Sequence, residues 1–146
     1  MPESLWEIFW LNRDLLNVIS GVAAGIIQEI ARKKNAVTGI FTALHTFGRD
    51  LKRNVHIHLS VTCGGLNDKN AWVNLFFPEA PIKKMWRHRI IELFRNEYKN
   101  QNLSLPHNYQ IKASFDLWMQ KLYETPWYVH LQKPSDNHKR NIEYLG

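Results

Sequence analysis

Hydrophobic and polar residues alternate one by one between Val55 and Val61. An alternation with a period of two residues is typical of a β-strand that packs one face on a hydrophobic core. It would place the imidazoles of His56 and His58 together on the opposite face. We therefore expect a strand that holds two metal-ligand side chains about 7 Å apart along the chain.

The first part of the chain has the spacing of a helix instead. Hydrophobic residues recur every three or four positions over Leu5–Ile30, and the run ends at the basic residues 32–34, whose charge suits a helix C-terminus. Ser4 is the expected N-cap, and Glu7 would complete a capping box. A bend near residues 20–21 is left open.

Two neighbouring strands are expected around the histidines. Val37–Phe47 is rich in β-branched and aromatic residues, and the polar segment Gly48–Asn54 connects it to the histidine strand. Antiparallel pairing of these strands would bring His45 beside the face that carries His56 and His58. The remaining predicted elements are strands at 71–77 and 125–133, and helices at 82–99, 114–123 and from 141 onward.

These elements predict the α+β class, with a mainly antiparallel central sheet and helices packed on it, in a single domain over residues 1–146. Lys and Arg exceed Asp and Glu by 19 to 13, and the net charge of +6 favours an anionic partner such as nucleic acid. The single cysteine, Cys63, excludes an internal disulfide and a cysteine-rich zinc site in this chain. No run of eighteen apolar residues and no signal-peptide pattern is visible, so we expect no membrane partner and a cytoplasmic location.

Three sequence blocks together resemble a known family. Residues 43–51 read Ala-Leu-His-Thr-Phe-Gly-Arg-Asp-Leu, His56-Ile57-His58 follows after a short spacer, and Gly64-Gly65-Leu66 comes next. This order resembles that of HUH-type transposases of the two-tyrosine rolling-circle insertion sequences, although Val55 stands where the family often has proline. Weaker matches follow in family order: Leu5-Trp6, Gly39, Phe77-Pro78, Trp86-Arg87, Trp127, Lys133-Pro134 and Glu143-Tyr144-Leu145-Gly146.

The resemblance implies an HUH endonuclease-like fold and a metal-dependent transposase that cleaves single-stranded DNA and transfers the strand. His56 and His58 would ligate Mg²⁺ or Mn²⁺, which polarises the scissile phosphate. His45 is the candidate third ligand. A hydrogen-bonding core histidine at position 45, and Asp50 as the alternative ligand, both remain open at this point.

The family carries two tyrosines four residues apart on a helix, and Tyr144-Leu145-Gly146 resembles the start of that motif. Tyr144 is therefore the candidate nucleophile, which would form a 5′-phosphotyrosine intermediate. Because the chain stops before the second tyrosine, we expect a domain truncated at or near the catalytic helix. A remnant that binds DNA without completing transfer is the alternative.

Basic residues beside the histidine strand are expected to contact DNA phosphates. These candidates are Arg49, Lys52, Arg53 and Lys133. The resemblance implies single-stranded DNA at transposon ends as the partner, in a prokaryotic, nucleoid-associated setting, and a homo-oligomer is left open. A 2H-type phosphoesterase is the rival enzyme class, since His58-Leu59-Ser60 fits its His-x-Ser element, but a second copy of that element is absent from the sequence.

Overall fold

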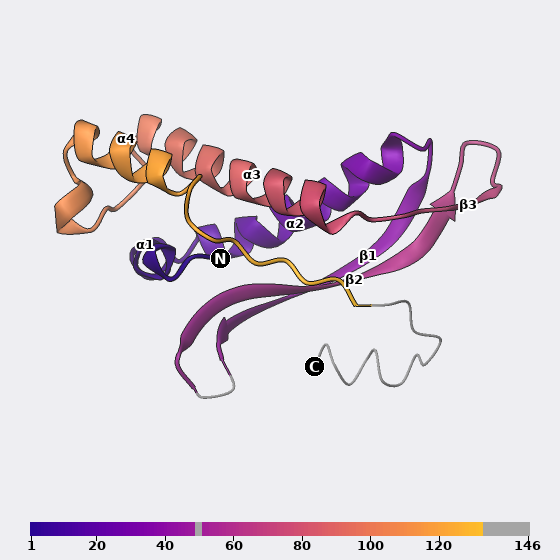
Figure 1. Cartoon of the computed structure of the whole chain (residues 1–146), viewed down its shortest axis with the longest axis horizontal. Coiled ribbons are helices and arrows are strands. Elements are labelled where there is room, and N and C mark those ends of the chain that lie inside the picture. The colour runs from indigo at the N-terminus through magenta and orange to yellow at the C-terminus, as the bar shows by residue number, and fades with distance from the viewer. Residues whose placement is uncertain (49–50, 133–146) are drawn as a thin grey trace.

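The computed structural model describes residues 1–48 and 51–132. Its three strands form one antiparallel sheet in the order β1-β2-β3, and the helices pack on that sheet, which confirms the α+β class (Figure 1). In chain order the elements are η1 (Glu3–Leu5), α1 (Trp6–Leu11), α2 (Leu15–Arg32), β1 (Val37–Phe47), β2 (Arg53–Leu66), β3 (Trp72–Asn74), α3 (Glu79–Lys99), η2 (His107–Tyr109) and α4 (Lys112–Lys121).

The N-terminal helical segment is divided, which corrects the prediction of one helix capped by Ser4. Ser4 lies inside η1, and the break falls at Asn12, whose backbone leaves the helical conformation. The Asn12 side-chain amide donates to the carbonyl oxygens of Ile8 and Ser104, and its oxygen accepts the Ser104 N–H, each at 2.7 Å. α2 then runs without interruption through Gly21, so no bend occurs there.

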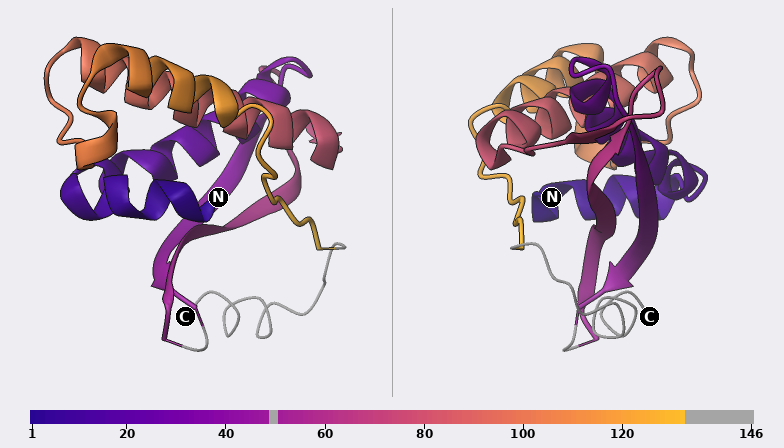
Figure 2. Two further views of the ribbon diagram at one scale, coloured as in Figure 1. Left: turned by 60° about the vertical axis from the view of Figure 1, so that its left-hand side comes forward. Right: turned by 90° about the vertical axis from the view of Figure 1, so that its right-hand side faces the viewer.

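β1 and β2 form a long twisted hairpin that supports the helical layer. The pairs Leu44↔Ile57 and Thr42↔Leu59 show the register, and Leu44, Ile57 and Leu59 pack against the hydrophobic core. α2 packs along this face of the two strands, α3 lies over α2, and α4 extends the helical layer (Figures 1 and 2). The alternate positions of both strands therefore face away from the helices.

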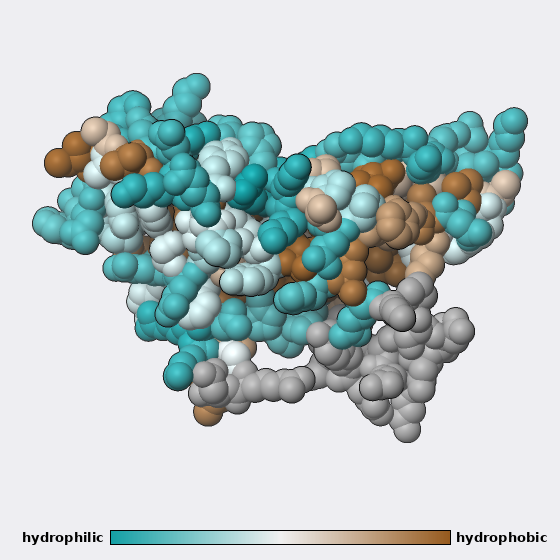
Figure 3. Space-filling view, viewed as in Figure 1, coloured by the Kyte–Doolittle hydropathy of each residue, from teal (hydrophilic) through white to brown (hydrophobic). Residues whose placement is uncertain are grey.

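The core lies between the sheet and the helices and within the helical layer. Its fully buried members include Phe9, Ile19, Ile90, Phe94 and Phe115. On the face shown in Figure 3, hydrophobic surface gathers between the start of α3 and β3, and a smaller hydrophobic patch lies at the opposite, left-hand tip.

The predicted strand at 125–133 is wrong over its described part, because residues 125–132 pair with no strand. Trp127 is instead buried to 1% exposure, and its indole N–H donates to the carbonyl oxygen of Leu122 at 2.8 Å. The strand predicted at 71–77 is also shorter than expected, since only Trp72–Asn74 pairs with β2. The helix predicted from residue 141 lies outside the described residues.

By length and composition alone, α2 could cross a membrane. In the structure, however, it is a packed helix: Ile19, Ile26 and Ile27 are buried in the core, and Glu29 pairs with Arg89 of α3. The absence of a membrane partner stays an expectation.

Candidate metal centre

The hairpin register places three histidines together on the face of the sheet that points away from α2. His45 of β1 is directly opposite His56 of β2, and His58 follows two residues later on the same face. The ring centroid of His45 lies 5.3 Å from that of His56 and 4.4 Å from that of His58, and the His56 and His58 centroids are 5.0 Å apart. The structure thus places His45 next to the other two histidines on the same face of the sheet, as the predicted strand pairing requires.

The three imidazoles are close enough to share one cation. Each offers a nitrogen, and these nitrogens all lie within 4.8 Å of one another. Two nitrogens bound to one ion at about 2.1 Å lie no more than about 4.2 Å apart, so small ring rotations would close the site. We refer to His45, His56 and His58 as the histidine triad.

Local contacts prepare these rings as ligands. The Nδ1–H of His56 donates to the carbonyl oxygen of Asn54 at 2.7 Å, since a carbonyl can only accept. That bond leaves Nε2 of His56 as the lone-pair nitrogen and fixes the ring orientation. Burial, and next the neighbouring His45 and His56, lower the pKa of His58 below its usual value of 6.5, which favours the neutral form that binds metal.

The chemistry of the donors limits which ions fit. Among the described residues, no carboxylate belongs to this cluster of potential metal ligands. Imidazole nitrogens suit first-row ions such as Ni²⁺ and Zn²⁺ best, whereas Mn²⁺ and Mg²⁺ are more often bound by oxygen. The residues present therefore fit a divalent transition-metal ion, and Mg²⁺ would need oxygen ligands from elsewhere.

The other candidate site residues are only partly within the described structure. Arg49, Asp50, Lys133 and Tyr144 lie outside the described residues, so their predicted roles stay predictions. Lys52 is exposed in the connection between β1 and β2. Arg53 is the first residue of β2, and its guanidinium lies 4.1 Å from the centre of the Trp10 ring.

Sequence reasoning missed the aromatic partner of Arg53. The helical spacing over Leu5–Ile30 includes Trp10 in one long helix, but Trp10 lies near the end of the short helix α1, half exposed, with Arg13 also over its ring at 5.4 Å. The only signal in the sequence is the proximity of Trp10 to Arg13. Nothing local connects either residue to a strand forty residues later.

An antiparallel sheet that carries three convergent imidazoles on the face away from α2 defines an α+β protein with a candidate metal centre. A family model described as "Putative transposase" matches residues 39–146, which include the whole triad. The chain belongs to this transposase family.

Two curated relatives match over the full length of the chain. It is 32% identical to the transposase for insertion sequence element IS801 of Pseudomonas savastanoi pv. phaseolicola, and it spans 36% of that protein. It is 23% identical to "Putative transposase y4qJ" of Sinorhizobium fredii (strain NBRC 101917 / NGR234), and it spans 40% of that protein. No solved structure matches the chain.

Proposed function

We propose that this chain carries the metal-binding part of a transposase that cleaves single-stranded DNA. The observation that carries the proposal is the convergence of the histidine triad on one face of the sheet, in a chain that belongs to a transposase family. The net charge of +6 supports a polyanionic substrate. The partner proposed is single-stranded DNA at transposon ends.

The triad would hold a divalent ion through His45 and His58 and through Nε2 of His56. When bound, such an ion supplies a Lewis acid that neutralises charge on the scissile phosphate. All three histidines are partly exposed, which would let a phosphodiester approach from the side away from the sheet. The bond from His56 to the Asn54 carbonyl keeps that ring aimed at the ion site during turnover.

Tyr144 is proposed as the nucleophile. Its phenol oxygen would displace the 3′-oxygen of the scissile phosphodiester, which leaves a 5′-phosphotyrosine bond and a free 3′-hydroxyl. Because one phosphate diester replaces another, the rejoining step needs no external energy source. The chain spans little more than a third of its curated relatives, so the full transposition reaction is a proposal for the longer protein.

Formation of a covalent adduct on labelled single-stranded DNA tests this function. With Mn²⁺, we expect an adduct that chelator abolishes, that Tyr144→Phe abolishes, and that His56→Ala with His58→Ala reduces at least about 100-fold. His107→Ala, at an exposed position in η2, is the matched control and should retain activity. An adduct that survives the double histidine change would contradict the assignment.

Two alternatives give different results in the same assay. A catalytically incomplete remnant would bind Mn²⁺ and DNA but form no adduct. A 2H-type phosphoesterase would hydrolyse its substrate in the presence of chelator.

A further inference from the structure

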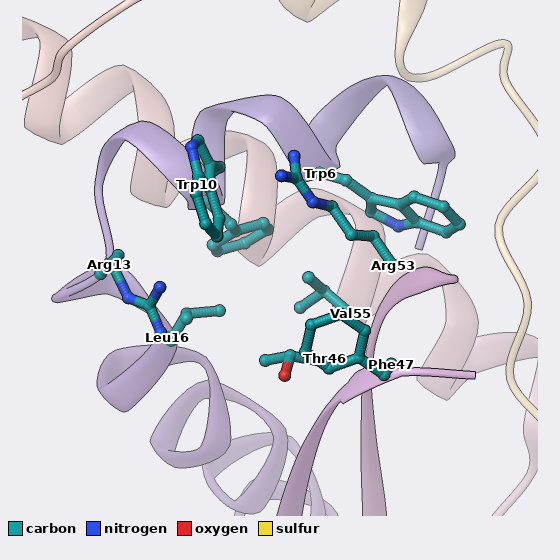
Figure 4. Close-up of a pocket in the computed structure, with 9 residues that line it drawn as sticks. Trp6, Trp10, Arg13, Leu16, Thr46, Phe47, Arg53 and Val55 are labelled. Atoms are coloured by element: carbon teal, nitrogen blue, oxygen red, sulfur yellow. The ribbon is translucent and has the colours of Figure 1, made fainter. Parts of the chain in front are cut away.

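A second feature lies at the end of the β1–β2 hairpin, on the helix side of the sheet. Aromatic and cationic side chains from α1, the α1–α2 connection and the two strands surround a small depression there (Figure 4). We call it the hairpin pocket, and the residues that matter for the argument are Trp10, Arg13, Phe47 and Arg53. Its free volume is about 70 Å³, room for a few water molecules but not for a whole nucleotide.

The pocket gathers positive charge, and none of the described residues that line it is acidic. The guanidinium carbons of Arg53 and Arg13 lie 4.1 and 5.4 Å from the centre of the Trp10 ring. Within residues 1–48 and 51–132, neither arginine takes part in an ion pair. The aromatic ring therefore orients two guanidinium groups, whose N–H donors can bind an anion.

An irregularity in the strand pairing connects the hairpin pocket to the triad. His45 pairs with His56, whereas Phe47 pairs with Arg53, so β2 has one extra residue between these pairs. Strict alternation would put Phe47 on the histidine face, but it lines the pocket beside Val55, on the helix side. A β-bulge redirects a side chain in this way, and bulges are frequent next to active sites.

The two features lie on opposite faces of the hairpin, so one continuous ligand would reach both by passing over its edge. Phe47 follows His45 by two residues, about 7 Å along an extended strand, and stacked DNA advances about 3.4 Å per nucleotide. A DNA strand whose phosphate lies at the triad would thus reach the hairpin end within a few nucleotides. The Phe47 ring is 53% exposed there.

We propose that the hairpin pocket binds one nucleotide of single-stranded DNA a few positions from the scissile phosphate. Its phosphate accepts hydrogen bonds from Arg13 and Arg53, which Trp10 holds in place, and its base stacks on the exposed Phe47 ring at the mouth. Stacking requires an unpaired base, so the pocket selects single strands over duplex. This inference rests on the proposed function, because single-stranded DNA is the substrate assigned there.

Fluorescence anisotropy of a labelled oligodeoxynucleotide, measured on the full chain in chelator, tests the pocket without any contribution from bound metal. Phe47→Ala should weaken binding by about 5-fold to 150-fold, as loss of a stacked base does. Phe76→Ala is the matched control, since Phe76 is 82% exposed and does not line the pocket. The control should bind as the wild type does.

A second variant keeps the test decisive if Phe47→Ala does not fold. Combined Arg13→Gln and Arg53→Gln should flatten the slope of log affinity against log salt by about 0.7, the value for one single-strand phosphate contact. The matched double control is Arg32→Gln with Lys34→Gln, both exposed at the end of α2. Its salt slope should stay at the wild-type value.

The outcomes separate this inference from the proposed function. Pocket variants that bind single strands as tightly as their controls, or a wild type that prefers duplex, would overturn the pocket and leave the adduct assay unaffected. No binding of single strands by the wild type would overturn the pocket and the DNA assignment together. If the pocket variants weaken single-strand binding as expected but the wild type forms no metal-dependent adduct, only the proposed cleavage would be overturned.

Discussion

Gly65→Ala is expected to destabilise the fold, because the Gly64-Gly65 pair lies where two segments approach closely. A Cβ atom added at Gly65 would lie 2.2 Å from the carbonyl oxygen of Val37 in the facing strand. The obstacle is backbone, so the strands must move apart, at a cost near the upper end of the 1–3 kcal/mol typical of overpacking. The lower entropy of the unfolded alanine chain offsets part of this, which leaves a net loss of about 2 kcal/mol.

Gly21→Ala is the matched control for the same chemical change. Gly21 lies inside α2, and a Cβ atom there would meet no other atom within 4 Å. Alanine should stabilise that helix by about 1 kcal/mol. Thermal unfolding followed by circular dichroism should therefore show a midpoint lowered by about 4–8 °C for Gly65→Ala and raised by about 2–4 °C for Gly21→Ala.

The direction of the shift in the unfolding midpoint of Gly65→Ala tests this prediction. If Gly65→Ala unfolds at or above the wild-type temperature, the close approach of β1 and β2 at this point is wrong. The Gly-Gly block would then need another explanation than steric fit.

Two further predictions concern the triad and the core. Metal-free protein should lose stability as the pH falls below about 6.5, because the pKa of His58 is lowered in the folded state and the unfolded chain therefore binds a proton at this histidine first. In urea titrations from pH 8 to 5, His58→Gln should weaken this pH dependence of the free energy of unfolding. Identical pH profiles for the variant and the wild type would contradict the prediction. Trp127→Phe should lower the free energy of unfolding by about 1–3 kcal/mol, since it leaves the buried Leu122 carbonyl oxygen without its indole N–H donor. An unchanged midpoint in urea would show that this hydrogen bond contributes nothing.

Local patterns in the sequence were sufficient for the parts of the fold that position the triad. The predicted strand Val37–Phe47 matches β1 at both ends, and the pairing that brings His45 to His56 follows from a short connection between two strands. Side-chain alternation is a property of each strand alone, so the common face of His56 and His58 could be read directly. Binding of a metal ion by the triad stays a prediction.

The errors fall where distant residues decide the structure. Asn12 ends α1 through hydrogen bonds to Ser104, 92 residues away, and no local pattern reveals that contact. Residues 125–132 have strand-like composition, but Trp127 is buried in the core and the segment pairs with no strand among the described residues. The pocket around Trp10 likewise depends on a bulge that brings Phe47 and Arg53 to one side.

Calorimetric titration with Mn²⁺ measures the central claim, that His45, His56 and His58 form one metal site. We predict one ion bound per chain at pH 7.5, with the affinity reduced at least about 100-fold by each single change to alanine and unchanged by His107→Ala. Wild-type affinity in His45→Ala would show that the third histidine is not a ligand. Failure of the wild type to bind any divalent transition-metal ion would contradict the metal centre itself.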